Sequence, residues 1–400
     1  MIPALDPILR LPGLRLAAML LILNGFIGAT LAPYTSLIGI DLLGLSHWVF
    51  AAMLVSASLV FVTSSVLFGV LGDHRIDRRR LSLASAAAMA AGAGLMSLWP
   101  NVPVFLLAHG VLLPLGGTLF VQSFALAREA AADAPGEDRP SILATIRAGY
   151  AVPWVLALPV WSALFRGGLD VLWIYPAACA VAVLLVVLLA WRGTATPAAR
   201  PLQPMSLRAA LREIAAPPVL LRVILLGPVS AIIALYLTLL GLVLDEAGRP
   251  TGDVALYAGG LAALEIPFML LLPRVLPRVG PSRMILIGTI LYCCHLGFLA
   301  PLSGTPFLWL LLLPGAAGGA AILTLPIAYL QDLLTDRPGA GSSLTALQKV
   351  AGDAVTAFCF TLGTALSGYG LVAVLGVVLA IAGSAALLSL DGRQDTPRQT

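Results

Sequence analysis

The chain has 400 residues, of which 60% are hydrophobic and only 10% are charged. A soluble globular protein carries about a quarter charged residues, most of them on its surface. This composition therefore excludes a soluble globule and indicates an integral membrane protein. The formal net charge of +4 gives no indication of nucleic-acid binding, because the basic residues cluster in the loops between apolar stretches.

Twelve apolar stretches are long enough to cross the ~30 Å hydrocarbon core as α-helices, whereas strands of a membrane barrel are only about ten residues long. The expected spans are 14–39, 47–71, 81–99, 103–127, 142–165, 169–191, 218–244, 253–273, 282–301, 306–330, 342–367 and 370–390. The sequence thus predicts an all-α integral membrane fold with twelve transmembrane helices. The first span is too long for a cleaved leader, so we expect the chain to keep its N-terminus.

The distribution of basic residues predicts the orientation, because positively charged loops stay on the cytoplasmic side. With both termini and the even-to-odd connections inside, only Arg166 and Arg249 of the 23 basic residues fall outside. Arg147, Arg222 and Lys349 lie within helices or at their ends, and all the others are inside. We therefore expect both termini in the cytoplasm and the odd-numbered helices running outward.

The chain divides into two halves at its longest connection. We expect an N-terminal six-helix bundle over 1–191, a cytoplasmic linker with an amphipathic helix over 192–217, and a C-terminal six-helix bundle over 218–400. Both halves start inside, and both have a basic inner connection after their second helix, at 72–80 and 273–283. This is the pattern of a parallel repeat, in which two bundles rock about a site near the membrane midplane.

The sequence lacks the features that are typical of several other classes of function. The four cysteines, Cys179, Cys293, Cys294 and Cys359, all fall inside predicted spans, so we expect no disulfide and no metal site. The chain has no phosphate-binding loop, no cofactor fingerprint and no set of catalytic residues, which argues against a nucleotide-driven pump and against an enzyme. Transport without a cofactor, driven by gradients, is the expectation that remains.

The connection after the second span resembles the signature loop of the major facilitator superfamily. It reads GVLGDHRIDRRRL over 69–81 and departs from the usual pattern at Ile76, where a glycine is expected. The alternative is a basic loop that only sets topology. The resemblance implies a loop that latches the second helix to the eleventh, and its residues are Gly69, Asp73, Arg75, Asp77, Arg78 and Arg79.

Three further stretches narrow this resemblance: FALAREA over 124–130, LEIP over 264–267 and YLQDL over 329–333. Together with Arg147, Trp154 and Pro159 in the fifth span, and Gly25, Gly28, Ala29 and Pro33 in the first, they resemble the bacterial sugar efflux transporter family over nearly the whole chain. The resemblance implies export of sugars or glycosides across the inner membrane in exchange for protons. We expect a monomer whose partners are the sugar, protons and the lipid bilayer.

Other interpretations are possible for the direction of transport and for the class of substrate. The glycine-proline motif typical of drug antiporters is reduced to ALPV over 157–160, and the fourth span lacks the basic residue that many drug exporters carry. A proton-coupled exporter of drugs or other small amphiphiles would share the fold but would need a larger apolar cavity. An uptake symporter is a further alternative, because direction depends on the gradients.

Four ionisable residues inside predicted spans are candidates for proton coupling or gating, because such residues are costly in a bilayer. Arg147 lies about 7 Å and Glu265 about 12 Å from the inner ends of their helices, counted at ~1.5 Å per residue. We predict that they pair across the two halves and that protonation of Glu265 weakens the pair. Lys349 and Asp353 lie four residues apart on one face, where they form either a proton relay or a self-neutralising ion pair.

Sugar recognition needs hydrogen-bonding groups of both kinds and a flat apolar surface for the ring. The expected substrate residues are Asn24, Gln122, Tyr236 and Gln348, with Trp154 either stacking on the sugar or packing in the bundle. Trp161 is expected to anchor its helix at the membrane surface. For His109 and His295 we favour structural roles, although a histidine titrates close to neutral pH.

Overall fold

The computed structural model of the chain describes residues 5–74, 77–131, 139–192, 216–333 and 338–394. Nearly all of these residues are helical, and none of those described forms a strand, which confirms the predicted all-α fold. Eleven helical stretches in the described ranges are long and apolar enough to cross a membrane. The remaining predicted span, 342–367, is occupied by α15, Pro338–Leu366, which carries Lys349 and Asp353.

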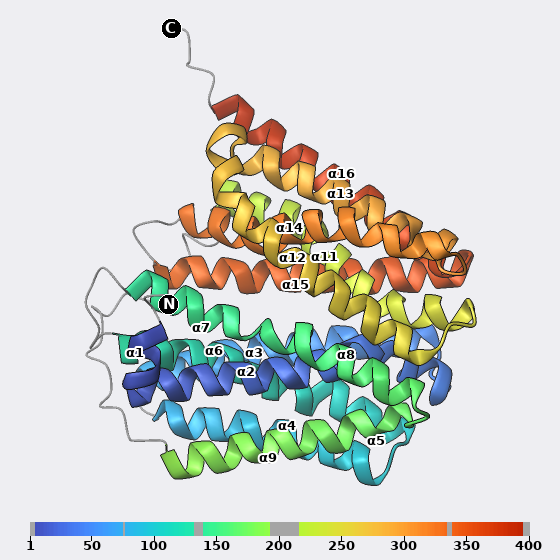
Figure 1. Ribbon diagram of the computed structural model, residues 1–400. Helices are drawn as coiled ribbons and strands as arrows, with labels where there is room; N and C mark the ends of the chain where they lie inside the picture. The colour runs from blue at the N-terminus through green and yellow to red at the C-terminus, as the bar shows by residue number, and fades with distance from the viewer. Residues whose placement is uncertain (1–4, 75–76, 132–138, 193–215, 334–337, 395–400) are drawn as a thin grey trace, which may run out of the picture. The chain divides into compact units, whose positions relative to one another are not determined.

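The first compact unit comprises Met1–Leu45 and Ser56–Gln203. Its helices are α1 (Leu5–Arg10), α2 (Pro12–Leu31), most of α3 (His47–His74), α4 (Arg78–Leu98), α5 (Val102–Leu107), α6 (Leu113–Ala130), α7 (Arg139–Gly149), α8 (Val152–Arg166) and α9 (Ile174–Arg192). Within this unit α4 packs against α6 and α9, and α2 packs against α6, α8 and α9 (Figure 1). The unit therefore has an interior lined by helices that are far apart in sequence.

The second unit comprises Pro204–Thr400 and the segment Ser46–Val55, the beginning of α3. Its other helices are α11 (Pro217–Glu246), α12 (Thr251–Val279), α13 (Pro281–Leu302), α14 (Leu312–Asp332), α15 and α16 (Tyr369–Gln394). Helix α11 packs against α15 and α16, and α14 packs against α12 and α13 (Figure 1). The segment from α3 is tied to α16, because His47 Nε2 lies 3.2 Å from the Tyr369 hydroxyl.

Several predicted spans are not continuous α-helices; the first, for example, passes from α2 into a 3₁₀ turn at Ala32–Tyr34 and a π-helical stretch at Leu37–Leu42. The fifth span breaks into α7 and α8, and Tyr150 N and Ala151 N donate to the carbonyls only three residues before them. Pro153 in the first turn of α8 has no N–H to continue the α-helical ladder, which explains the break. The fourth span contains a π-helical stretch, Ala108–Leu112, between α5 and α6 and just before Pro114.

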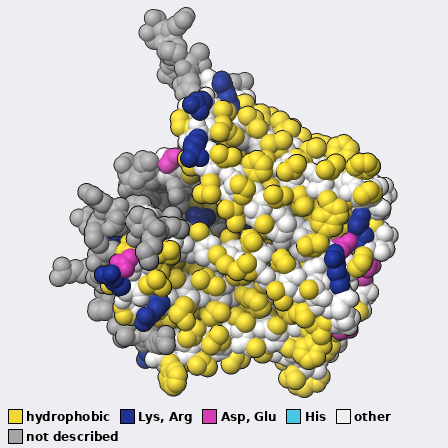
Figure 2. Space-filling model, viewed as in Figure 1, with side chains coloured by type: hydrophobic (Ala, Val, Ile, Leu, Met, Phe, Trp, Pro, Cys, Tyr) yellow, Lys and Arg dark blue, Asp and Glu magenta, His cyan; other side chains and the backbone are white. Residues whose placement is uncertain are grey.

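The surface has the composition expected of a protein in lipid. On the face shown in Figure 2, hydrophobic side chains cover most of the described area and charged side chains are few. Large apolar residues are exposed along the helices, among them Trp48, Leu270 and Leu366. Polar side chains are found inside instead, including Asn24, Gln122 and His295. Lipid tails cannot hydrogen-bond such groups, so polar side chains are costly on the lipid-facing surface. We therefore expect the functional site in the interior, where these side chains lie.

Candidate functional site

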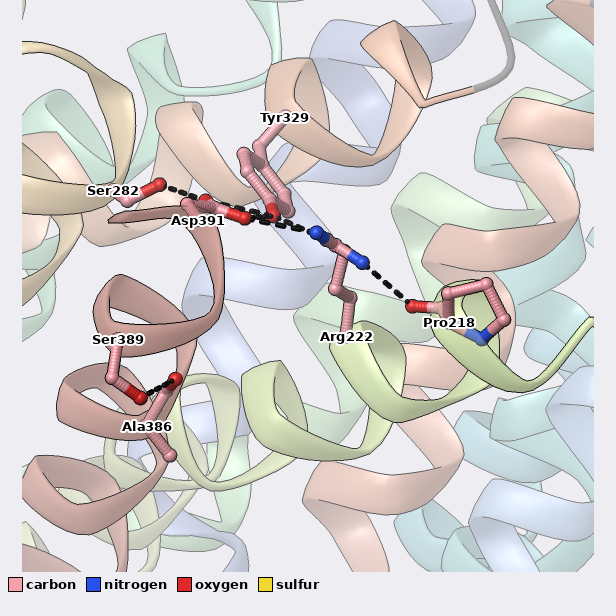
Figure 3. A network of polar contacts seen from close by, with 7 residues as sticks. All are labelled: Pro218, Arg222, Ser282, Tyr329, Ala386, Ser389 and Asp391. Carbon is pink, nitrogen blue, oxygen red and sulfur yellow. Dashed lines mark hydrogen bonds and ion pairs between the residues drawn. The ribbon is translucent and has the colours of Figure 1, made fainter. Parts of the chain in front are cut away.

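A buried polar network lies at the end of the second unit at which α11 begins (Figure 3). Arg222 of α11 is only 6% exposed, and its Nε donates to the Tyr329 hydroxyl at 2.8 Å. Its Nη2 donates to Asp391 Oδ1 at 3.1 Å, and its Nη1 donates to the Pro218 carbonyl at 3.0 Å. The arginine thus joins the first turns of α11 to the last turns of α14 and α16.

Asp391 is the acceptor at the centre of this network. The Tyr329 hydroxyl lies 3.0 Å from both of its carboxylate oxygens, and the Ser282 hydroxyl of α13 donates to Oδ2. Each charged group therefore has several hydrogen-bond partners, which a buried ion pair requires in order to offset its desolvation. Sequence reasoning missed this network, because 169 residues separate Arg222 from Asp391.

The first unit carries its own network at the beginning of α4. Asp77 caps α4 by accepting from the Arg79 N–H at 3.0 Å, and Arg78 Nε lies 2.6 Å from Glu129 Oε1 at the end of α6. Arg79 Nε donates to the Leu189 carbonyl at the end of α9, at 2.8 Å. These three residues of the predicted latch loop thus hold three helices of one unit together.

The rest of the predicted latch is described only in part. Gly69 lies within α3, and a methyl group added there would meet open space. The side chain of Asp73 and the whole of Arg75 lie outside the described residues. Glu129, which the loop motif did not identify, is the acidic partner of this network and belongs to the FALAREA stretch.

Glu265 lies on α12 against a glycine of α14. A side chain at Gly319 would overlap Glu265 Oε1, so the absence of a Cβ there is what allows the carboxylate to approach α14. Glu265 also interacts electrostatically with the phenol groups of Tyr236 on α11 and Tyr292 on α13. The Glu265 carboxylate is therefore placed against α14, among the helices of the second unit.

The α15 polar residues occupy two different faces. Lys349 Nζ lies 2.7 Å from Asp353 Oδ2, and their side chains are 48% and 17% exposed. Gln348 Nε2 instead donates to the Leu226 carbonyl of α11 at 3.2 Å, and the Thr356 hydroxyl donates to the Gly352 carbonyl at 2.9 Å. Gln348 therefore packs against α11, while Lys349 and Asp353 form an intrahelical ion pair.

Two predicted substrate residues are buried in the first unit. Asn24 of α2 and Gln122 of α6 are 5% and 1% exposed. Neither amide atom of Gln122 has a hydrogen-bond partner among the residues that the structure describes. An unpaired buried amide costs about 1–3 kcal/mol, so its retention favours a role other than folding.

The break between α7 and α8 packs on glycines of α2. A Cβ at Gly28 would lie 3.0 Å from the Tyr150 hydroxyl and 3.7 Å from Trp154, and a Cβ at Gly25 would overlap the Tyr150 carbonyl. Trp154 is part-buried there. Trp161 was expected at the membrane surface, but it is 6% exposed and its Nε1 donates to the Thr30 hydroxyl at 3.0 Å, so that expectation is wrong.

The two histidines have different surroundings. His109 stacks on Phe105 at a centroid distance of 4.4 Å, and its Nε2 lies 2.9 Å from the Tyr175 hydroxyl. His295 Nδ1 lies 3.0 Å from the Leu311 carbonyl, but its Nε2 has no partner among the described residues. Both are buried, as a structural role requires.

Arg147 and Glu265 belong to different units, and each is described only within its own. Arg147 lies near the end of α7 with an exposed side chain, and Glu265 is part-buried on α12. Their predicted pairing across the two halves stays a prediction. No group of three or more metal-ligating side chains occurs in the described ranges.

The chain is similar to known transporters along most of its length. A family model described as Major Facilitator Superfamily matches residues 16–357. The chain is 28% identical over 345 residues to "Sugar efflux transporter A" of Dickeya chrysanthemi, covering 84% of this chain and 85% of that protein. A Deinococcus radiodurans protein whose name also contains "sugar efflux transporter" is 28% identical over 391 residues, covering 92% and 95%. These relatives confirm the predicted resemblance.

The fold is also that of solved transporters. The crystal structure of nucleoside transporter NupG superposes with a TM-score of 0.78 at 14% identity, covering 96% of this chain and 99% of that one. At this identity the likeness concerns the fold alone. It agrees with the predicted arrangement of twelve transmembrane helices.

Proposed function

Because the chain belongs to the Major Facilitator Superfamily, we propose that it exports sugars or glycosides from the cytoplasm in exchange for protons. The family places it among transporters and not among enzymes. The observation that carries the proposal is the similarity to proteins named sugar efflux transporters over 84% and 92% of the chain. Two six-helix bundles, 1–191 and 218–400, would alternate around a central site, with 192–217 as the cytoplasmic linker.

The proposed sugar site uses buried amide, phenol and indole groups. Gln122 offers a donor and an acceptor without partners among the described residues, and the Tyr236 hydroxyl is likewise unused. Asn24 and Gln348 supply further amides, and Trp154 supplies a flat apolar surface for the ring. Such a set suits a polyhydroxylated ligand better than an apolar drug, since each hydroxyl of a sugar needs a partner once it leaves water.

The proposed coupling uses carboxylates inside the helices. Glu265 would pair with Arg147 when the inner side is closed and would release it when protonated. Asp353, bonded to Lys349 at 2.7 Å, is the second candidate carrier. Both carboxylates lie on helices proposed to span the membrane, where an ionisable residue is energetically costly, so its presence there favours a functional role.

The proposed orientation follows from the basic residues. Both termini and the polar networks around Arg78 and Arg222 would face the cytoplasm of a bacterial cell, with the chain acting as a monomer in the inner membrane. Asp73, Arg75 and the other predicted latch residues would then control which side is open. A change at Asp73 should alter the populations of the open states more than sugar affinity.

Counterflow in proteoliposomes tests the proposed function. Vesicles loaded with unlabelled sugar are given trace amounts of labelled glucose, lactose or another member of a sugar panel, at two pH values. Transient accumulation of a labelled sugar, accompanied by proton movement reported by a trapped pH dye, is the expected result. Exchange of a cationic drug such as ethidium with no exchange of any sugar would replace this proposal with that of a drug exporter.

A further inference from the structure

Two glycines of α14 each accommodate a polar side chain from a neighbouring helix. A Cβ at Gly315 would lie 2.5 Å from His295 Nδ1, and a Cβ at Gly319 would overlap Glu265 Oε1. The two glycines are one helical turn apart, so they lie on the same face of α14 about 6 Å from each other along the axis. His295 of α13 and Glu265 of α12 therefore approach the same face of α14, one turn apart.

Tyr236 of α11 lies beside His295. Its ring centroid is 5.0 Å from that of His295, and its phenol interacts electrostatically with Glu265. The side chain is 3% exposed, and its hydroxyl has no partner in the part of the chain that the structure describes. A buried hydroxyl normally has a partner, so this one is available for transient hydrogen bonds.

His295 has one committed and one uncommitted nitrogen. Nδ1 lies 3.0 Å from the Leu311 carbonyl, which can only accept, so Nδ1 carries a proton and neutral His295 leaves Nε2 as an acceptor. The side chain is 0% exposed, and Nε2 has no partner within the described ranges. The hydrogen bond to Leu311 thus fixes the tautomer that can receive a proton at Nε2.

A polar row on α12 leads from the end of the helix to Glu265. Asp253, Tyr257 and Glu265 are spaced by four and eight residues and so share one face of α12. Asp253 is bonded to Arg249 at 3.2 Å, and the Tyr257 hydroxyl lies 3.3 Å from His295 Nδ1. In the orientation proposed above, this end of α12 is external, so the row points from the external side towards Glu265.

We infer that His295, Tyr236 and Glu265 form a proton path within the second unit, entered from the end at which α12 begins. This inference rests on the proposed exchange of sugar for protons and adds the route by which external protons reach Glu265. A proton that enters from the external end of α12 is taken up at His295 Nε2, and the ring becomes imidazolium. The imidazolium returns a proton to the Tyr236 oxygen as the phenol passes its own proton to the Glu265 carboxylate, so only Glu265 ends protonated.

The surroundings of the path contain few other titratable groups. Helix α11 contributes Tyr236, α13 contributes Tyr292 and the neighbouring Cys293, and α12 contributes Tyr257. The residues of α14 that contact Glu265 and His295 are glycines. Its Tyr329, at the other end of the helix, is hydrogen-bonded to Arg222. Glu265 and His295 have lower ordinary pKa values than the tyrosines and the cysteine around them, so they are the groups that we assign as proton carriers on this path.

The test compares two fluxes in proteoliposomes: counterflow of the labelled sugar that exchanges fastest in the panel, and sugar-linked proton flux reported by trapped pyranine. We expect the ratio of proton flux to counterflow to fall about tenfold in Tyr236→Phe and in His295→Gln. Tyr236→Phe removes only an oxygen that has no partner among the described residues, so it should fold even if His295→Gln does not. The ratio is independent of how much protein is active.

Matched controls come from the first unit. His109→Gln and Tyr175→Phe change another buried histidine–tyrosine contact, at 2.9 Å, and should leave the ratio within twofold. An unchanged ratio in both Tyr236→Phe and His295→Gln overturns the path alone. Sugar counterflow without any proton flux in the unmodified protein overturns the proposed coupling, and the path with it.

Discussion

Arg222 Nη2 lies 3.1 Å from Asp391 Oδ1, and this ion pair joins the beginning of α11 to the end of α16 (Figure 3). Both residues also contact the Tyr329 hydroxyl, so three helices meet at one buried point. In the first unit, Arg78 and Glu129 join the beginning of α4 to the end of α6. Each unit therefore has a polar clamp that fixes helix ends, while Gln122 and Tyr236, whose polar atoms have no partner among the described residues, lie along the helices.

The first prediction concerns this clamp. Asp391→Asn should lower the free energy of unfolding by about 3–5 kcal/mol, because it leaves the Arg222 guanidinium buried beside a neutral partner. Thermal unfolding of the purified protein in detergent measures the effect. Asp6→Asn is the control, because the Arg10–Asp6 pair is 77% and 62% exposed and such pairs contribute about 0–1 kcal/mol. Equal losses in the two variants would contradict the assigned role of the clamp.

The sequence predicts those structural features that are determined by residues close together in the chain. Apolar length indicated twelve helices, and the spacing of Lys349 and Asp353 indicated an intrahelical ion pair as one of two alternatives; the two side chains do lie 2.7 Å apart. Which face of α15 meets α11 was not predictable, since Gln348 and Lys349 are adjacent and equally polar. The answer depended on Gly227 and Gly352, where the two helices pack closely.

Contacts between distant segments were beyond sequence reasoning. No short-range sequence pattern pairs Arg222 with Asp391. Likewise, no pattern in α12 or α14 indicates that Glu265 packs against Gly319. A signal was present in the run GAAGG over 315–319, because closely spaced glycines in a membrane helix indicate close approach of a neighbour. The break at Tyr150 had a signal too, in Pro153, which the apolar length of the span obscured.

The second prediction concerns two adjacent glycines of α14. Gly319→Ala should change stability by less than about 1 kcal/mol, because only the flexible end of Glu265 must move, but it should reduce sugar-linked proton flux severalfold. Gly318→Ala should instead cost about 1–3 kcal/mol, because its Cβ would meet Tyr292 N at 2.5 Å and Gly288 O at 2.6 Å. Thermal unfolding and proteoliposome flux measure the two effects, and a reversed order would count against the placement of Glu265.

The third prediction separates binding from folding at Gln122. Gln122→Leu should leave stability unchanged or raise it by roughly 1–3 kcal/mol, since it removes two amide atoms that lack partners among the described residues. The same change should weaken sugar binding at least tenfold in counterflow. As a control, Gln348→Leu should lower stability by about 0.5–1.5 kcal/mol, because it removes the bond to the Leu226 carbonyl. A destabilised Gln122→Leu protein with normal sugar affinity would make Gln122 a structural residue.

The fourth prediction distinguishes a proton carrier from a self-neutralising pair on α15. Asp353→Asn should abolish the response of sugar exchange to an imposed pH gradient and should change stability by no more than about 1 kcal/mol, since Lys349 is half-exposed. The double variant Lys349→Asp with Asp353→Lys keeps an ion pair at the same spacing but moves the carboxylate one turn, about 6 Å. If the position of the carboxylate matters, this variant stays uncoupled, whereas recovery of the pH response would show that the pair only neutralises itself.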